Sequence, residues 1–330
     1  MIQPWITLSF HTLLLSKCYS YLFTCWLCGA QETRLTANID AMDTLLQKLE
    51  SAEDESLITI VKTGLSVARN AGSIVEDAFY KLKNVKGKDC ATDLVTETDK
   101  AVEKVIFDSL KNVFPSHCFI GEESASEGAP IKLTDEPTWI VDPIDGTTNF
   151  VHMNPNVAVS IGFTRNKKTV VGIVFAPILK DMYVAVRGFG AVCNERRLRI
   201  QNPVPSLSQA LVACEWGAGR EEERVRDVAK NFVDILLKHK IHGLRCSGSA
   251  ALNMCFVAAN AVDLYFEWGP HCWDFAASSL IVEEAGGANS TSHGAEFDLM
   301  DRTVICASSR KLIDDLVPTL TQIPTSRDDA

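Results

Sequence analysis

The spacing of apolar residues predicts several long helices. Between residues 56 and 82, apolar side chains recur every three or four positions, which is typical of an amphipathic helix packed on a core. The same spacing predicts a second helix that starts at Thr98 and Asp99 and ends near Val113, and a charged helix over residues 221–240. We expect Val113 and Leu236 to lie on the inward faces of these two helices.

Short runs rich in β-branched and aromatic residues lie between and after these helices. The runs at 157–163, 169–176 and 182–186 are separated by turn sequences and predict an antiparallel meander. Earlier runs at 119–121 and 139–141 predict short strands, and the second of them should end before Pro143, which cannot donate to a sheet. Strands at 211–214, 262–267 and 303–307 alternate with helices, so the pattern indicates a mixed α/β fold.

The first 55 residues differ from the rest. Residues 1–30 are apolar and carry only Lys17 as a formal charge, without the basic start of a signal peptide. Polar residues interrupt the apolar run, so a membrane-spanning helix is not favoured, and a membrane-associated form is the alternative. We therefore predict that residues 1–55 are a disordered apolar extension and polar linker, and that residues 56–330 form the folded domain.

Composition narrows the classes of function. The 330 residues carry a net charge of −10, which argues against a general nucleic-acid binder, because such proteins gain affinity from lysine and arginine. The 11 cysteines show no regular framework and indicate mostly buried, reduced thiols in a cytosolic protein. Cys25 and Cys28 have the spacing of a metal or redox pair, but no second pair supports that role.

The stretch from Trp139 to Phe150 carries the most distinctive chemistry. Asp142 and Asp145 follow a buried strand, Gly146 permits a sharp bend, and two threonines come next. A strand, a turn and a helix cap would explain part of this stretch, but a simple turn needs neither the second aspartate nor both threonines. Two carboxylates beside a helix start form a plausible site for a hard cation and an anion.

Other polar segments have an ordinary structural interpretation, which must be weighed against a functional one. Asp99 and Asp274 stand in the first turn of predicted helices, where an acid stabilises the helix dipole. Adjacent acids such as Glu122 and Glu123 are usually solvated. Small residues at 248–251 begin a helix, whose amides face either a substrate or closely packed neighbours.

Four of these segments, in the same order, resemble the motifs of the inositol monophosphatase family. They are the run from Asp142 to Phe150, the Gly121-Glu122-Glu123 element, the segment from Asp93 to Asp99, and Trp273-Asp274 followed by Glu284-Ala285-Gly286-Gly287. Ser278 stands where the last motif often has glycine. The resemblance covers about residue 56 to the end, and implies a layered αβαβα sandwich, a homodimer, and lithium-sensitive, Mg²⁺-dependent activity.

The resemblance also implies roles for single residues. Two or three Mg²⁺ ions would be held by Glu122, Asp142, Asp145 and Asp274 and by the backbone carbonyl of Ile144. Asp99 and Thr147, with Glu122, would act in catalysis. The implied substrate-binding residues are Asp145, Gly146, Thr147, Thr148, Gly248, Ser249, Ala250, Glu267 and Asp274. No histidine nucleophile is required, and His271 is interpreted as structural.

The function implied by the resemblance is hydrolysis of myo-inositol monophosphate to myo-inositol and phosphate. The reaction would proceed by in-line attack of a metal-activated water, in the cytoplasm, on a small-molecule inositol phosphate as the partner. One alternative keeps the chemistry and changes the substrate to another sugar phosphate or a bisphosphate nucleotide. A second is a non-catalytic protein that binds inositol phosphate.

Overall fold

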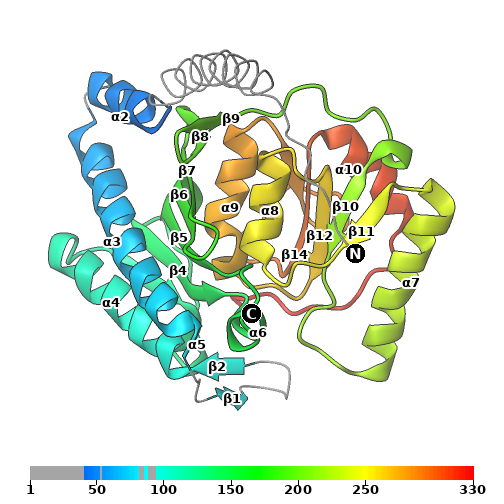
Figure 1. Ribbon diagram of the computed structural model, residues 1–330, viewed down its shortest axis with the longest axis horizontal. Coiled ribbons are helices and arrows are strands. Elements are labelled where there is room, and N and C mark those ends of the chain that lie inside the picture. The colour runs from blue at the N-terminus through cyan, green and yellow to red at the C-terminus, as the bar shows by residue number, and fades with distance from the viewer. Residues whose placement is uncertain (1–40, 53, 82–84, 88–93) are drawn as a thin grey trace, which may run out of the picture.

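The computed structural model describes residues 41–52, 54–81, 85–87 and 94–330. The predicted apolar extension and the Cys25–Cys28 pair lie outside these residues, and so do residues 31–40 of the predicted linker. Two large sheets and three sets of helices alternate through the molecule in the order αβαβα, which confirms the predicted layered sandwich (Figure 1).

The first large sheet has seven strands in chain order. They are β3 (Cys118–Gly121), β4 (Thr138–Asp145), β5 (Ala158–Arg165), β6 (Lys168–Ala176), β7 (Asp181–Val186), β8 (Gly190–Cys193) and β9 (Arg196–Leu198). Only β3 and β4 run parallel, and every later pair is antiparallel. The predicted meander is therefore confirmed.

The second large sheet has five strands in the order β11-β10-β12-β14-β13. Their bounds are β10 (Leu211–Cys214), β11 (Gly243–Arg245), β12 (Leu264–Trp268), β13 (Ala288–Ser290) and β14 (Thr303–Ala307). Strands β11, β10 and β12 are parallel, so their carboxyl ends meet at one edge of the sheet. A separate antiparallel pair joins β1 (Val85–Gly87) to β2 (Leu94–Thr96).

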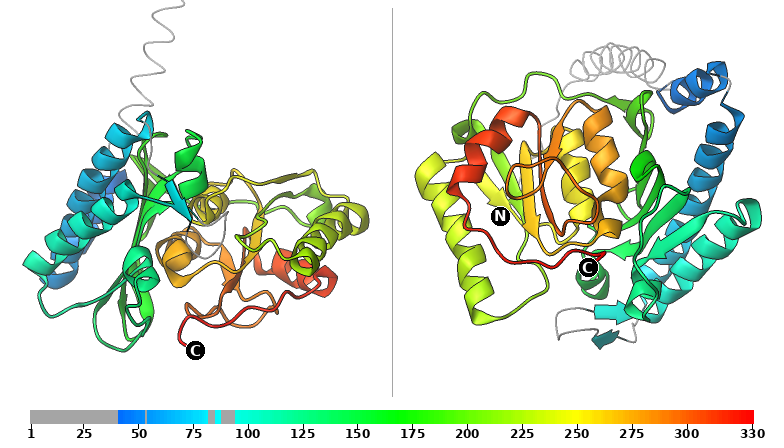
Figure 2. Two further views of the ribbon diagram at one scale, coloured as in Figure 1. Left: turned by 90° about the horizontal axis from the view of Figure 1, so that it is seen from below. Right: turned by 180° about the vertical axis from the view of Figure 1, so that it is seen from behind.

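Helices cover both outer faces and fill the space between the sheets. Helices α3 (Glu55–Phe79) and α4 (Glu97–Val113) cover the outer face of the seven-stranded sheet. Helices α8 (Ala250–Ala258) and α9 (Cys272–Glu284) lie between the sheets, and α7 (Glu222–His239) and α10 (Arg310–Leu316) cover the far face (Figure 2). Short elements complete the chain: α5 (Glu122–Ser126), α6 (Thr147–Val151), η1 (Leu207–Gln209) and η2 (Val317–Thr319).

The alternation of side chains along each strand produces the layers. In β4, Trp139 and Val141 belong to the core beneath α3 and α4, whereas Ile140 belongs to the core around α8 and α9. In β12, Tyr265 faces the central helices, and its neighbours Leu264 and Phe266 face α7 and α10. Because successive side chains point to opposite faces, a strand covered by helices on both sides is apolar throughout.

Glycines allow α9 to lie directly on the seven-stranded sheet. A Cβ at Gly172 would lie 2.2 Å from the carbonyl oxygen of Ala277, and one at Gly162 would lie 2.9 Å from the Cβ of Ala276. The neighbouring Ser278 is fully buried, and its hydroxyl lies 3.4 Å from the carbonyl oxygen of Phe275. Serine, at a position where the resembled motif often has glycine, is therefore accommodated within the helix.

The prediction that a strand ends before Pro143 is wrong. Strand β4 continues to Asp145, and its pairing with β5 shifts register between Asp142 and Asp145. An irregular stretch of this kind tolerates a proline, because a ladder hydrogen bond is already missing there.

Three other predictions from the sequence also need correction. Residues 41–51, predicted to belong to a disordered linker, form helix α2 (Ala41–Ser51), and this helix buries Leu45 and Leu49 against the core under α3. Leu236 on α7 is 43% exposed and Val113 at the end of α4 is 48% exposed, so neither faces inward. Their helices cover the core with a narrower stripe than the sequence suggests.

Among the residues that the structure describes, no helix has both the length and the apolar character needed to cross a bilayer.

Candidate metal and substrate site

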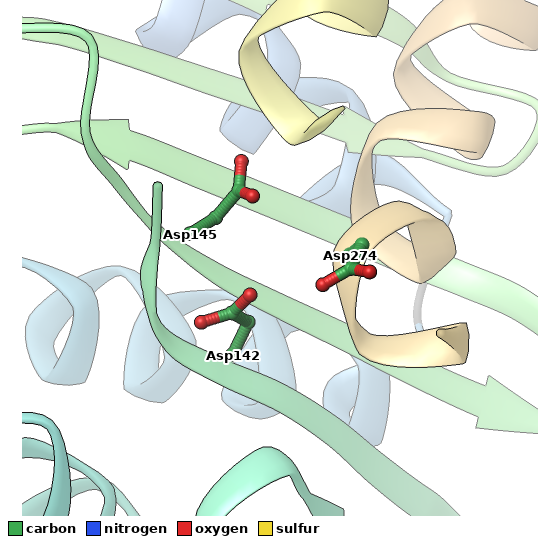
Figure 3. A group of neighbouring side chains, drawn as sticks. All are labelled: Asp142, Asp145 and Asp274. Carbon is green, nitrogen blue, oxygen red and sulfur yellow. The ribbon is translucent and has the colours of Figure 1, made fainter. Parts of the chain in front are cut away.

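Three aspartates from two distant segments form the centre of the site. Asp142 and Asp145 come from the irregular end of β4, and Asp274 comes from the first turn of α9. One carboxylate oxygen from each lies within 4.8 Å of the others, and Figure 3 shows the carboxylates around one space between the two elements. A set made only of carboxylate oxygens suits Mg²⁺, Mn²⁺ or Ca²⁺.

The end of β4 fixes its own two aspartates. The amide of Ile144 donates to Asp142 Oδ1 over 2.9 Å, which closes a tight turn around the side chain. The register shift between the two aspartates breaks the strict alternation of the strand. Both carboxylates can therefore reach the space beside Asp274, where a regular strand would direct residues 142 and 145 to opposite faces.

Glu122 lies close enough to complete the acidic group. Burial raises the pKa of Asp142 well above its usual value, and the nearby carboxylates of Glu122, Asp145 and Asp274 raise it further. Burial, then Asp145 and Glu122, raise the pKa of Asp274 in the same way. Like charges crowded out of water repel one another, so a divalent cation would relieve the largest electrostatic cost at this site.

A residue that the sequence analysis missed holds Glu122 in place. Glu103 on α4 accepts hydrogen bonds from the amides of Glu123 (2.8 Å) and Ser124 (2.9 Å), and from the Ser124 hydroxyl. It thereby secures the start of α5, where Glu122 is the first residue. Helix spacing shows that position 103 lies near the buried face of α4, but not that its carboxylate meets a loop 20 residues later.

Asp99 and Thr147 lie next to the aspartates. Asp99 is fully buried at the start of α4, where Oδ2 accepts from the amide of Thr96 (2.9 Å) and from the Thr96 hydroxyl. Thr147 Oγ1 lies 3.2 Å from Asp99 Oδ1 and 3.1 Å from the carbonyl oxygen of Ile144, so the Thr147 hydroxyl can donate a hydrogen bond to either oxygen. Burial raises the pKa of Asp99 to about 6.

The start of α8 faces Asp145. The Asp145 carboxylate accepts hydrogen bonds from the Ser249 hydroxyl and from the amides of Ala251 (2.9 Å) and Ala250 (3.3 Å). The sequence suggested that amides here would face a substrate or close neighbours, and in the structure these two already have an acceptor. Burial raises the pKa of Asp145 to about 6, and these hydrogen bonds oppose the rise.

Two glycines bring the β4 loop against the loop before α8. Gly146 has φ of +94°, and a Cβ there would lie 2.9 Å from the carbonyl oxygen of Asn156 and 3.0 Å from that of Gly248. Gly248 has φ of +78°, and a Cβ there would lie 2.8 Å from Asn149 Nδ2. Asn149 Nδ2 in turn donates to the carbonyl of Ser247 over 2.7 Å. Glycine at both positions therefore permits the close contact between the loops.

Glu215 is a second residue near the site that was not predicted from the sequence. Its Oε1 accepts from the amides of Ser247 (2.7 Å) and Gly248 (2.8 Å) and from the side chain of Asn253 (2.8 Å). The residue directly follows β10, at the carboxyl edge of the parallel strands. That location was a usable signal, since ligand sites of open α/β sheets gather at this edge.

The remaining predicted substrate residues border the aspartates. Glu267, at the end of β12, is 9% exposed and accepts a hydrogen bond from the Tyr265 hydroxyl. Burial raises its pKa well above the usual value, and Glu215, Asp274 and Asp145 are close enough to contribute. Thr148 is exposed, in the first turn of α6.

The inositol monophosphatase family model matches residues 56–325. This chain belongs to that family. It is 46% identical over 265 residues to inositol monophosphatase 1 of Bos taurus, an alignment that covers 80% of this chain and 95% of the relative. The human inositol monophosphatase 1 matches equally well, and the human inositol monophosphatase 2 is 42% identical over 268 residues, covering 81% of this chain and 92% of the relative.

Solved structures of similar proteins share the fold. The inositol monophosphatase from Anabaena superposes with a TM-score of 0.69 at 28% identity, covering 82% of this chain and 98% of that chain. The suppressor protein suhB from Bartonella henselae gives a TM-score of 0.71 at 29% identity, covering 80% and 99%. The family match includes every residue that we assign to the site.

The acidic centre makes a testable prediction about pH. An acid with a higher pKa in the folded protein than in the unfolded chain binds more protons when folded, so its contribution to stability falls as pH rises through that range. Asp99 and Asp145 have pKa values raised from 3.8 to about 6, which places this loss between about pH 4 and pH 6. A bound divalent cation should offset that loss once the carboxylates are ionised.

We therefore expect Mg²⁺ to raise the Tm by several °C at about pH 7.5, and by much less at about pH 5. Differential scanning fluorimetry with Mg²⁺ and with EDTA at both pH values measures this difference. An equal Mg²⁺ effect at the two pH values would contradict the proposed competition between protons and metal.

Proposed function

We propose that this chain is a Mg²⁺-dependent phosphatase that hydrolyses myo-inositol monophosphate to myo-inositol and phosphate. The observation that carries the proposal is the group of Asp142, Asp145 and Asp274, drawn from segments more than 120 residues apart in a chain of this family. Relatives 46% identical over 80% of the chain bear the name inositol monophosphatase 1, which supports the substrate.

The proposed metal site comprises the carboxylates of Glu122, Asp142, Asp145 and Asp274 and the carbonyl of Ile144. The fit of this all-oxygen set to Mg²⁺ supports the choice of ion, since Mg²⁺ takes carboxylates and substrate phosphate as ligands. When bound, Mg²⁺ supplies a Lewis acid for the phosphoryl oxygens and makes nearby water more acidic. We propose that the site binds two or three Mg²⁺ ions.

Asp99 and Thr147 are proposed to orient the attacking water. The carboxylate of Asp99 lies 3.2 Å from Thr147 Oγ1 and can accept a hydrogen bond from this hydroxyl. The threonine oxygen can then accept a hydrogen bond from the attacking water. Gly146, Thr147 and Thr148 are proposed to contact the phosphate, because they begin α6 directly beside Asp145. Glu122 would contribute through its carboxylate, which is close enough to raise the pKa values of Asp142 and Asp274.

The inositol ring is proposed to lie against Glu267 and the loop of Gly248, Ser249 and Ala250. Glu267 is held by Tyr265 at the end of β12, close to Asp145 and Asp274. A carboxylate in this position can accept hydrogen bonds from ring hydroxyls. The Asp145–Ser249 contact fixes the loop relative to the acidic centre.

Replacement of Glu267 tests the proposed position of the ring. We expect Glu267→Gln to lower kcat/KM for inositol 1-phosphate about 10-fold or more, because a hydrogen bond to a charged group contributes about 1.5–3 kcal/mol. Steady-state phosphate release measures the change. A phosphate ester without ring hydroxyls, such as 4-nitrophenyl phosphate, is the control, and an equal loss on both substrates would place Glu267 outside the ring site.

A substrate panel tests the proposed activity itself. We expect Mg²⁺-dependent phosphate release to be fastest with inositol 1-phosphate, compared with galactose 1-phosphate, fructose bisphosphate, histidinol phosphate and 2′-AMP. The nucleotide belongs in the panel because a staphylococcal relative at 25–26% identity has been solved both with inositol monophosphate and with 2′-AMP. Tight binding of inositol 1-phosphate without phosphate release would instead support a binding protein.

Three further properties belong to the same proposal. Lithium should inhibit the activity, the chain should form a homodimer, and the enzyme should act in the cytoplasm. Light scattering after size exclusion tests the second against the chain mass of 36.2 kDa.

A further inference from the structure

Asp328 contacts the start of α9, the helix whose first turn carries Asp274, from a segment that the mechanism does not use. Residues after η2 leave α10 and cross to the layer that contains α9, in red in Figure 2. The Asp328 side chain is only 1% exposed, whereas that of the adjacent Asp329 is 38% exposed. A carboxylate loses its hydration on burial, so it persists there only where specific donors replace water.

The donors of Asp328 all belong to the start of α9. Its Oδ2 accepts from the amide of Cys272 over 2.8 Å, and its Oδ1 lies 2.6 Å from Nδ1 of His271. Cys272 is the first residue of α9, so its amide has no acceptor within the helix. The backbone of Asp328 is itself held, because its amide donates to the carbonyl of Met300 over 3.0 Å.

The same turn holds Asp274. The amide of His271 donates to Asp274 Oδ2 over 2.7 Å, so Asp274 and Asp328 accept from consecutive amides. Arg302 secures the preceding loop through the carbonyls of Gly269 (2.5 Å) and Pro270 (3.4 Å), and its Nε lies 3.7 Å from Asp328 Oδ1. The position of the Asp274 carboxylate therefore depends on a backbone turn that Asp328 fixes from outside the helix.

We propose that Asp328 is a positioning residue for Asp274, which it places for divalent-cation binding by holding the amide of Cys272 and the imidazole of His271. The inference rests on the proposed metal site. Asp328 contacts neither substrate nor reacting atoms, and acts through the first turn of α9. Partners that orient metal ligands typically change metal affinity about 10- to 100-fold when they are replaced.

The test compares Asp328→Asn with Asp329→Asn in the full chain. Asparagine keeps the size of the side chain and one good acceptor, but cannot serve both the Cys272 amide and His271 as a carboxylate does. Asp329 is the matched control, because it lies next in the chain and bonds to Arg327, whose guanidinium also reaches Asp298.

We expect Asp328→Asn to weaken Mn²⁺ binding about 10-fold, measured by calorimetry without substrate, and to raise the half-activating Mg²⁺ concentration by a similar factor. Asp329→Asn should change neither.

A purely structural role would give a different result. In that case Asp328→Asn would lower the Tm and leave the Mn²⁺ affinity of the folded protein at the wild-type value, which would overturn the inference. If Asp328→Asn melts below the assay temperature, Asp328→Glu replaces it, since the charge is kept and the carboxylate is displaced. Weaker Mn²⁺ binding by Asp328→Glu would support the inference, and wild-type affinity would overturn it.

Failure of the metal site itself is distinguishable from failure of this inference. If the proposed function is wrong, wild-type protein neither binds Mn²⁺ through the aspartates nor releases phosphate. If only the role of Asp328 is wrong, the wild type does both and the two asparagine variants match it.

Discussion

Asp142→Asn is expected to reduce kcat for inositol 1-phosphate by about 10³-fold or more while leaving the fold intact. Asp142 stands at the centre of the acidic group, and the loss of this proposed metal ligand should remove several kcal/mol of transition-state stabilisation. Asparagine retains an oxygen for the amide of Ile144, which donates to Asp142 Oδ1. Phosphate release at saturating Mg²⁺ measures the loss.

Stability should move in the opposite direction from activity. Burial and three neighbouring carboxylates raise the pKa of Asp142, so its ionised form is unfavourable without metal. A neutral side chain removes that cost, and the Tm of the variant in EDTA at about pH 7.5 should equal or exceed the wild-type value. Asp108→Asn is the control, because Asp108 lies exposed on α4 in a pair with Lys104. Near-normal turnover by Asp142→Asn would refute the site assignment.

Asp99→Asn should be the second most damaging change, with kcat about 10²- to 10⁴-fold lower, the range typical of a positioned proton acceptor. The asparagine side chain of this variant would use its single carbonyl oxygen for Thr96 and turn an NH₂ group toward Thr147. The threonine hydroxyl would then lose the acceptor that lies 3.2 Å away in the wild type. Single-turnover phosphate release separates this chemical effect from substrate binding.

Loss of the helix cap is the competing explanation for that result. Thr96→Ala removes the threonine half of the cap at the start of α4 and leaves the Asp99 carboxylate in place against Thr147. We expect a modest loss of stability, about 1 kcal/mol, and at most a small loss of activity. If Thr96→Ala is as inactive as Asp99→Asn, then the cap matters rather than the contact between Asp99 and Thr147.

Much of the fold could be predicted from the chain because helix and strand periods are local signals. The long helices and the meander follow from the spacing of apolar side chains, and the family motifs supplied the order of the layers. The predictions were wrong where tertiary contacts, rather than the local sequence, determine the structure. Pro143 indicated the end of a strand, but β4 tolerates it at a register shift, and Leu236 continued an apolar stripe beyond the width of the core that α7 covers.

The site was partly predictable for a similar reason. The aspartates stand in motifs with unusual composition, so they could be singled out before their positions were known. Glu103 and Asp328 could not, because each acts on a backbone amide 20 or more residues away. Glu215 also bonds a distant amide, but its position directly after a strand was a usable signal. A single acidic residue within a helix or in the last residues of the chain gives no indication of such a partner.

The central claim is that Glu122, Asp142, Asp145 and Asp274 share one divalent cation site, and a crystal soaked in Mn²⁺ tests it most directly. Anomalous scattering locates the manganese ions independently of any assumption about the ligands. The proposed function predicts the strongest peaks between the end of β4 and the first turn of α9, within bonding distance of these carboxylates. Manganese bound elsewhere, with this space left empty at concentrations that support turnover, would contradict it.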